Sequence, residues 1–179
     1  MLNIKRIARK FESTDGAEIA EAALVLPLVF MLLLGIVWFG RAFNIYSTIT
    51  QAAQQGAITA ARASCATCGN TPSDNITVEN TIAAVLQASS LKPGQIKEAP
   101  NPGLLPCPSP APPGGCTKTS NHIWVCRTVQ LNPSAGLTQP PQCGTVVSFQ
   151  YPFQFYLPFT SLNMQKIKLS AQAQSRMEN

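Results

Sequence analysis

Hydrophobic and polar positions divide the chain into an apolar N-terminal part and a mixed remainder. Residues 22–40 are 19 consecutive positions without a charge, AALVLPLVFMLLLGIVWFG. As a helix rising 1.5 Å per residue, this run would be about 28 Å long, which matches the roughly 30 Å hydrocarbon core of a bilayer. A buried helix of a soluble core is the alternative, but the chain has few long apolar segments to cover one. The run therefore predicts a membrane span.

The charges around this run predict its orientation. Four cations precede it, namely Lys5, Arg6, Arg9 and Lys10, whereas Arg41 is the one cation close behind it. The positive-inside rule then places the N-terminus in the cytoplasm and the C-terminal region outside the inner membrane. A cleaved secretory signal peptide is disfavoured, because the run exceeds an h-region of about 7–15 residues and lacks a small-residue cleavage site.

Apolar residues continue at three- and four-residue spacing after Arg41, as on one face of a helix. They are Phe43, Ile45, Tyr46, Ile49, Ala52, Ala53, Gly56, Ala57, Ala60 and Ala61. We expect one helix over residues 17–63, roughly 70 Å long, with the membrane span at about 22–40. Pro27 predicts either an incidental kink or a packing feature. A second helix is expected over residues 75–90, with Ser73 or Asp74 as its cap.

Three later segments alternate with the period of a half-buried strand. In the first segment, the residues of one face are Ile123, Val125 and Val129, which alternate with Trp124, Cys126 and Thr128. Val147, Phe149, Tyr151, Phe153 and Phe155 do so in the second, and Ile167, Leu169, Ala171 and Ala173 in the third. The pattern predicts an antiparallel sheet of three strands covered by the long helix, hence an α+β fold. The Phe-rich face is expected to be core.

Between the helices and these strands lies a proline-rich stretch. Residues 93–113 contain eight prolines, which exclude a regular helix or a central strand and predict an exposed loop. A disulfide between Cys107 and Cys116, or from either of them to another element, would tether it.

Composition narrows the classes of function. Only 12% of residues are charged and the net charge is +5 without a cluster, which argues against a nucleic-acid binder. The six cysteines favour disulfides in an oxidising compartment, with 15 connectivities open. They are Cys65, Cys68, Cys107, Cys116, Cys126 and Cys143.

Catalytic chemistry has little support in the sequence. His122 is the single histidine and has no evident acidic partner, and the acids outside the N-terminal part are few and scattered. Cys65 and Cys68 have the spacing of a redox or zinc half-site, but a βαβ context and a second tight pair are missing. We expect no enzyme, cofactor or metal; a membrane-tethered thiol oxidoreductase that uses Cys65 and Cys68 is the enzymatic alternative.

The sharpest motif precedes the apolar run. A cut after Gly16 would leave Ala17 as the first residue and Glu21 as the fifth, directly before the span. This arrangement resembles the processing site of type IV prepilins, and residues 16–62 resemble the TadE-like family of tight-adherence pilus proteins. The shared features are Gly16 with Glu21, the L-x-L-P of residues 24–27, and the Phe39-Gly40-Arg41 exit.

The resemblance implies a leader, 1–16, that a prepilin peptidase removes, and an exported domain, 64–179. It implies a pseudopilin or minor pilin in the bacterial inner membrane, with other pilins, an inner-membrane assembly platform and lipid as partners. Glu21 would pair with the terminal amine of a neighbouring subunit; its other interpretation is a polar first turn favoured by the helix dipole. Pro27, Gly35 and Gly40 are candidate helix-packing positions. An uncleaved bitopic anchor with a binding domain is the alternative function.

Overall fold

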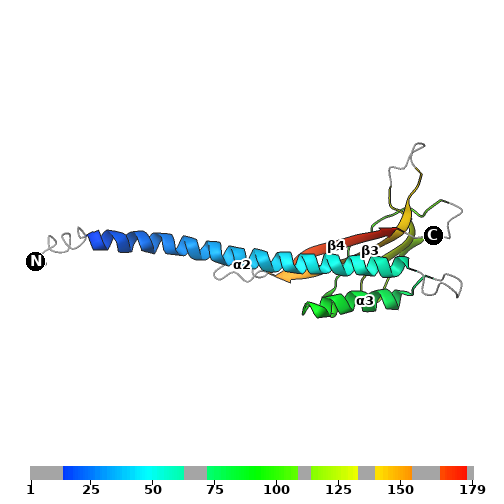
Figure 1. Cartoon of the computed structure of the whole chain (residues 1–179), viewed down its shortest axis with the longest axis horizontal. Coiled ribbons are helices and arrows are strands. Elements are labelled where there is room, and N and C mark those ends of the chain that lie inside the picture. The colour runs from blue at the N-terminus through cyan, green and yellow to red at the C-terminus, as the bar shows by residue number, and fades with distance from the viewer. Residues whose placement is uncertain (1–13, 63–71, 109–113, 133–139, 155–165, 177–179) are drawn as a thin grey trace, which may run out of the picture. The chain divides into compact units, whose positions relative to one another are not determined.

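The computed structural model describes residues 14–62, 72–108, 114–132, 140–154 and 166–176 (Figure 1). Helix α2 runs from Thr14 to Ala61 and continues through Pro27. The chain forms two compact units, Met1–Phe43 and Asn44–Asn179. The first unit contains the N-terminal part of α2, and the second contains the rest of α2 with all other elements. The long helix expected from the sequence is therefore present.

Within the second unit, α2 packs through small and β-branched residues. Ile45, Ile49, Ala52, Ala53, Ala57 and Ala60 are buried, whereas Tyr46 is 48% exposed. A Cβ added to Gly56 would lie 2.8 Å from the Ile82 side chain and 3.7 Å from that of Val147. Gly56 therefore lies where α2 approaches both the second helix and the sheet.

Helix α3, Asn75–Ala88, buries Val78, Ile82 and Leu86. It begins at Asp74, whose carboxylate accepts a hydrogen bond from the Thr77 N–H at 2.9 Å, as an N-cap does. Ser73 donates to the carbonyl of Thr59 at 2.6 Å, so the start of α3 lies beside the end of α2. The expected second helix is confirmed, with Asp74 as its cap.

Four strands form one antiparallel sheet in the order β1-β2-β3-β4. They are β1 (Gly115–Lys118), β2 (Trp124–Gln130), β3 (Cys143–Gln154) and β4 (Lys166–Arg176). The expected α+β class is confirmed and all three expected strands are present, but the sequence did not predict a fourth strand, β1, which pairs with β2 through residues 115–118. Phe155, expected at the end of the second strand, lies outside the described residues.

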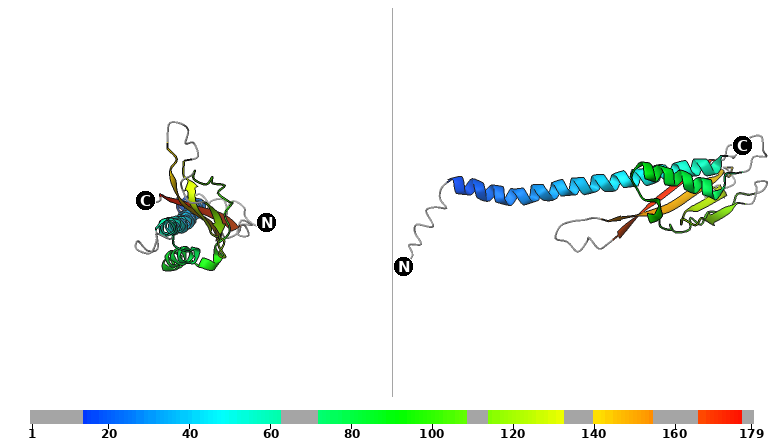
Figure 2. Two further views of the ribbon diagram at one scale, coloured as in Figure 1. Left: turned by 90° about the vertical axis from the view of Figure 1, so that its right-hand side faces the viewer. Right: turned by 90° about the horizontal axis from the view of Figure 1, so that it is seen from below.

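Both helices cover one face of this sheet (Figure 2). The residues of that face that are buried include Val125, Val147, Phe149, Tyr151, Phe153, Ala171 and Ala173. Phe149 is fully buried, so the Phe-rich face is core, as expected. Short Ala171 and Ala173 on β4 and the alanines of α2 allow helix and sheet to approach closely.

Strand β2 carries a bulge that changes which face its last residues occupy. Val125 lies opposite Val147, but Val129 lies opposite Gly144, a shift of register between Cys126 and Val129. Thr128 has φ 52° at this point. One extra residue turns the following side chains to the other face, so Val129 packs with Cys126 and Val146. The expectation that Val129 shares a face with Val125 is wrong.

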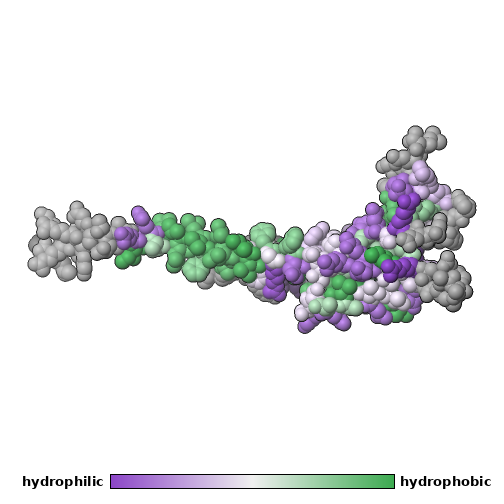
Figure 3. Space-filling model, viewed as in Figure 1, coloured by the Kyte–Doolittle hydropathy of each residue, from purple (hydrophilic) through white to green (hydrophobic). Residues whose placement is uncertain are grey.

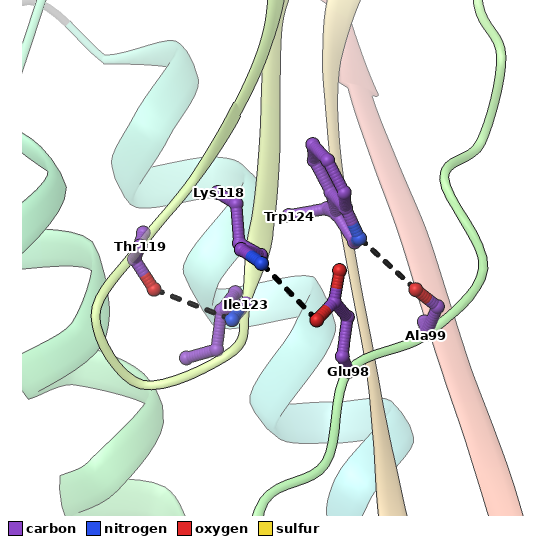
Figure 4. Close-up of polar contacts among 6 residues, drawn as sticks. All are labelled: Glu98, Ala99, Lys118, Thr119, Ile123 and Trp124. Carbon is purple, nitrogen blue, oxygen red and sulfur yellow. Dashed lines mark hydrogen bonds and ion pairs between the residues drawn. The ribbon is translucent and has the colours of Figure 1, made fainter.

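The proline-rich segment covers that second face. Lys97 exchanges two backbone hydrogen bonds with Gln150, both 2.8 Å, and farther along the chain Cys107 N–H donates to Thr128. Between these points the carbonyl of Ala99 accepts from Trp124 Nε1 at 3.0 Å, and Glu98 pairs with Lys118 at 3.2 Å (Figure 4).

The segment is therefore not an exposed loop throughout, because Ile96, Ala99 and Cys107 are buried. It also includes a short 3-10 helix, η1 (Pro93–Gln95). Proline excludes a regular strand here but leaves isolated ladder hydrogen bonds to the flanking residues.

Candidate functional site

The most unusual surface of the chain is the N-terminal part of α2. Its large apolar side chains are exposed on all sides, with Met31, Phe39 and Phe43 each at 73%. In the view of Figure 3, this part of α2 is almost uniformly hydrophobic beyond its hydrophilic start. An exposed apolar surface of this size marks a contact with a membrane or with another protein. Among the described residues, Glu18–Ala61 is long and apolar enough to cross a membrane.

The predicted processing residues lie at the start of this helix. Gly16 and Ala17 fall within the first turn of α2, and Gly16 is partly buried. Glu18 and Glu21 follow within the next turns and are exposed. Acids in this position suit the positive end of the helix dipole, and Glu21 is the last acid before the uncharged run of residues 22–40.

The three predicted packing positions are spread along the same helix. Gly35 and Gly40 have open space around them, since an added Cβ would meet nothing within 4 Å at either residue. Pro27 stands inside the helix, where it lacks a donor for the preceding turn. Any packing role of these residues therefore depends on a neighbouring molecule and not on this chain.

Arg41 ends the uncharged run with an aromatic contact. Its guanidinium carbon lies 5.6 Å from the centre of the Trp38 ring, within the range of a cation–π interaction. Tryptophan and arginine together are typical of the boundary between hydrocarbon and water. This pair stands at the end of the uncharged run of residues 22–40.

Two disulfides hold the second face of the sheet. Cys107 pairs with Cys143, with Cα atoms 5.9 Å apart, and joins the proline-rich segment to the start of β3. Cys116 pairs with Cys126 across β1 and β2. The expected bond to another element is confirmed for Cys107 and for Cys116, and these two do not pair with each other. Cys65 and Cys68 lie outside the described residues.

Polar side chains elsewhere attach elements to one another. Glu79 on α3 accepts from the Asn121 backbone at 3.2 Å and from its side-chain amide at 2.9 Å, which fastens α3 to the turn between β1 and β2. His122 is exposed in this turn at φ 63°. In the described part of the chain, no three His, Cys, Asp or Glu side chains come together as a metal site.

Arg127 on β2 was not singled out by the sequence, although it organises the start of α3. It donates to the Ser73 carbonyl and to Asn75 Oδ1. Burial lowers the pKa of Arg127 below its ordinary value, and the charge of Asp74 opposes this shift only in part. The hydrogen bonds of Arg127 thus hold the start of α3 against β2. A lone arginine in a strand carries no local pattern that would have revealed this role.

A long exposed apolar helix at the N-terminus, followed by a small α+β domain, defines a candidate single-pass membrane anchor. The family model described as TadE-like protein matches residues 16–57 of this chain. No curated protein and no solved structure matches the chain significantly. The match confirms the resemblance to the TadE-like family over these residues and indicates a pilin-like protein associated with tight-adherence pili, which implies contacts with other pilus components.

Proposed function

We propose that this protein is a pseudopilin or minor pilin that acts structurally in the assembly of a tight-adherence pilus. The observation that carries the proposal is one coincidence. The family match begins at Gly16, and the exposed apolar surface of α2 begins a few residues later, at Ile19. Processing signal and membrane helix are therefore adjacent, as a prepilin peptidase acting at the membrane surface requires.

In this mechanism, a prepilin peptidase removes residues 1–16 on the cytoplasmic side of the bacterial inner membrane. The apolar helix then holds the protein in the lipid, with the C-terminal domain on the outer side. The basic leader carries four cations. Its removal therefore lowers the free-energy cost of moving the N-terminus of the helix out through the membrane. The inner-membrane assembly platform would then associate processed subunits laterally.

Glu21 supplies the register of that association. A carboxylate at the edge of the hydrocarbon costs a few kcal/mol unless it meets a cation. Cleavage after Gly16 creates a cation at the Ala17 α-amine. Pairing between Glu21 of one subunit and this amine of a neighbour would favour a single axial offset between their helices. The open space at Gly35 and Gly40 would let a neighbouring helix approach closely.

The decisive experiment is the N-terminus and intact mass of the protein extracted from its native membrane. A start at Ala17 is the expected result, and it should revert to Met1 in cells that lack the peptidase. Glu21→Val should then abolish incorporation into pili while the protein remains in the membrane. Glu18→Val is the matched control, because it removes the same charge three residues earlier and should leave assembly intact.

The apolar helix alone also supports a second function, an uncleaved bitopic anchor with an outer binding domain. A start at Met1 in cells with an active peptidase would favour this function. Equal pilus assembly by the Glu21→Val and Glu18→Val variants would also count against the pilin proposal.

A further inference from the structure

Strand β4 forms one border of the sheet. It is the last strand in the order β1-β2-β3-β4 and is 11 residues long. Figure 1 shows β4 beside β3. Among the described residues, its backbone hydrogen bonds run to β3 along Lys166–Arg176. A long strand at the border of a sheet presents a row of unpaired donors and acceptors.

The register shows which backbone groups these are. Gln150 exchanges both of its backbone hydrogen bonds with Lys97, so its N–H and C=O point away from β4. In an antiparallel pair, the residue opposite such a position also directs its groups away from the partner strand. Ser170 lies opposite Gln150 and therefore presents N–H and C=O outward. By the two-residue alternation, the even-numbered positions 166–176 do the same.

The side chains of these even positions share the face opposite the helices. They are Lys166, Lys168, Ser170, Gln172, Gln174 and Arg176, and all are exposed. They include three cations and no acid. On the helix-covered face, Ile167 remains 45% exposed opposite Phe153. The border of β4 thus has outward N–H and C=O groups along its edge, positive charge on one face and exposed apolar area on the other.

We propose that the outer border of β4 binds an extended segment of another protein, added as a fifth antiparallel strand with acidic residues on the face of the β4 cations. Backbone pairing would supply the affinity and the alternating acids the selectivity. In the register that pairs all 11 residues, a second copy of β4 fits less well. A symmetric antiparallel pair centred on Ala171 would place Lys166 of one copy opposite Arg176 of the other, and like charges directly opposite are destabilising.

A synthetic peptide tests the proposal against the full chain in phosphatidylcholine nanodiscs, whose headgroups carry no net charge. The peptide has 11 residues, to match β4, with Glu opposite Lys166, Lys168 and Arg176, Val beside Ile167, and Thr or Ser elsewhere. Fluorescence anisotropy of the labelled peptide should show saturable binding. A peptide of the same design with Lys for Glu should not bind.

Backbone pairing is separated from charge attraction by N-methylation. Methyl groups on the peptide nitrogens that face β4 should weaken binding more than tenfold, because several hydrogen bonds are lost and each contributes a few-fold. Methyl groups on the alternate nitrogens, which face solvent, should have little effect. This comparison leaves the protein itself unchanged.

A protein variant provides the reciprocal test. Gln172→Pro removes an outward N–H and no bond to β3, so it should abolish peptide binding while the thermal midpoint stays within a few degrees. Gln172→Ala keeps the N–H and should bind like the original. Equal binding of both N-methylated peptides, or no binding of any peptide, would overturn the proposal. Dimers that Gln172→Pro dissociates would also overturn it, since a second copy would then occupy the border.

Discussion

Gly56 is a residue at which the packing of α2 against α3 tolerates little change. Its missing side chain leaves room for Ile82, which an added Cβ would approach to 2.8 Å, and Ile82 is fully buried. The helix gains propensity when Gly is replaced by Ala, by roughly 1 kcal/mol. A larger side chain cannot be accommodated unless the Ile82 side chain or α3 moves.

We therefore expect Gly56→Val to lower the free energy of unfolding by about 1–3 kcal/mol, the usual cost of overpacking. Denaturant unfolding of the oxidised protein measures this. Ile82→Val alone should cost about 0.5–1.5 kcal/mol, yet it should partly restore the Gly56→Val variant, because it removes Cδ1, one of the two Ile82 atoms that lie 2.8 Å from an added Cβ. Additive losses in the double variant would show that the two residues do not share the space.

Asp74 gives the domain a predictable dependence on pH. Hydrogen bonds from Thr77, and to a smaller extent the charge of Arg127, hold the pKa of Asp74 below its ordinary value of 3.8. The unfolded chain therefore binds this proton more readily, and stability rises with pH across this range. The stabilisation is complete above about pH 5 and is lost as pH falls through the lowered pKa.

Asp74→Asn keeps an oxygen that can cap α3 but removes the titration. Thermal midpoints measured between pH 2 and 6 should fall less steeply toward acid in this variant than in the original protein. Glu98→Gln is a suitable control, because it also removes one carboxylate, but one that belongs to a surface ion pair with Lys118 and does not cap α3. An unchanged acid slope in Asp74→Asn would show that the cap contributes nothing through its charge.

At the scale of elements, the periodicity of apolar residues predicted the helices and strands that bury one face. The buried stripe of α2, the face of α3 and the three longer strands all follow from apolar spacing. Strand β1 was missed because Gly115–Lys118 is short and has no apolar alternation. Its pairing with β2 depends on a turn and a disulfide. Local sequence contains neither the bulge at Thr128 nor the bridge from Lys97 to Gln150.

The candidate site divides in the same way. The sequence predicts Gly16, Glu21 and the apolar run as features of the site, because these features depend on residue order and composition alone. The disulfide partners are not, because Cys107 meets Cys143 only through the bulged register of β2, which brings the segment around Leu105 beside Gln130. Long-range pairing is a property of the assembled sheet.

The two disulfides should differ in their contribution to stability. Cys107 and Cys143 are 36 residues apart in sequence, whereas Cys116 and Cys126 are 10 apart. In the chain-entropy description, the longer loop contributes about 3–4 kcal/mol and the shorter one about 1 kcal/mol less. The paired variants Cys107→Ser with Cys143→Ser, and Cys116→Ser with Cys126→Ser, compared by denaturant unfolding, should follow this order. The reverse order would show that local packing outweighs loop length.

At the scale of the whole molecule, the apolar surface of α2 should make the protein intolerant of charge in a limited window. Leu32 lies near the middle of the uncharged run, and Arg at such a position raises the apparent cost of insertion by about 3 kcal/mol. We expect Leu32→Arg to reduce the fraction that resists carbonate extraction from membranes. Phe43→Arg, beyond the run, should stay in the membrane pellet, and equal loss of both would argue against a span at 22–40.

The two disulfides also determine how the protein must mature. Cys116 and Cys126 lie between Cys107 and Cys143 in the chain, so the bonds are nested. Under the proposed topology these cysteines reach the outer side of the membrane from the N-terminal end onward. An oxidant that joins them in order of arrival would make Cys107–Cys116 and Cys126–Cys143, and neither bond is native. Thiol–disulfide exchange must then rearrange them. The yield of folded protein should therefore depend on disulfide isomerase activity, and a strong oxidant alone should accumulate a mispaired form.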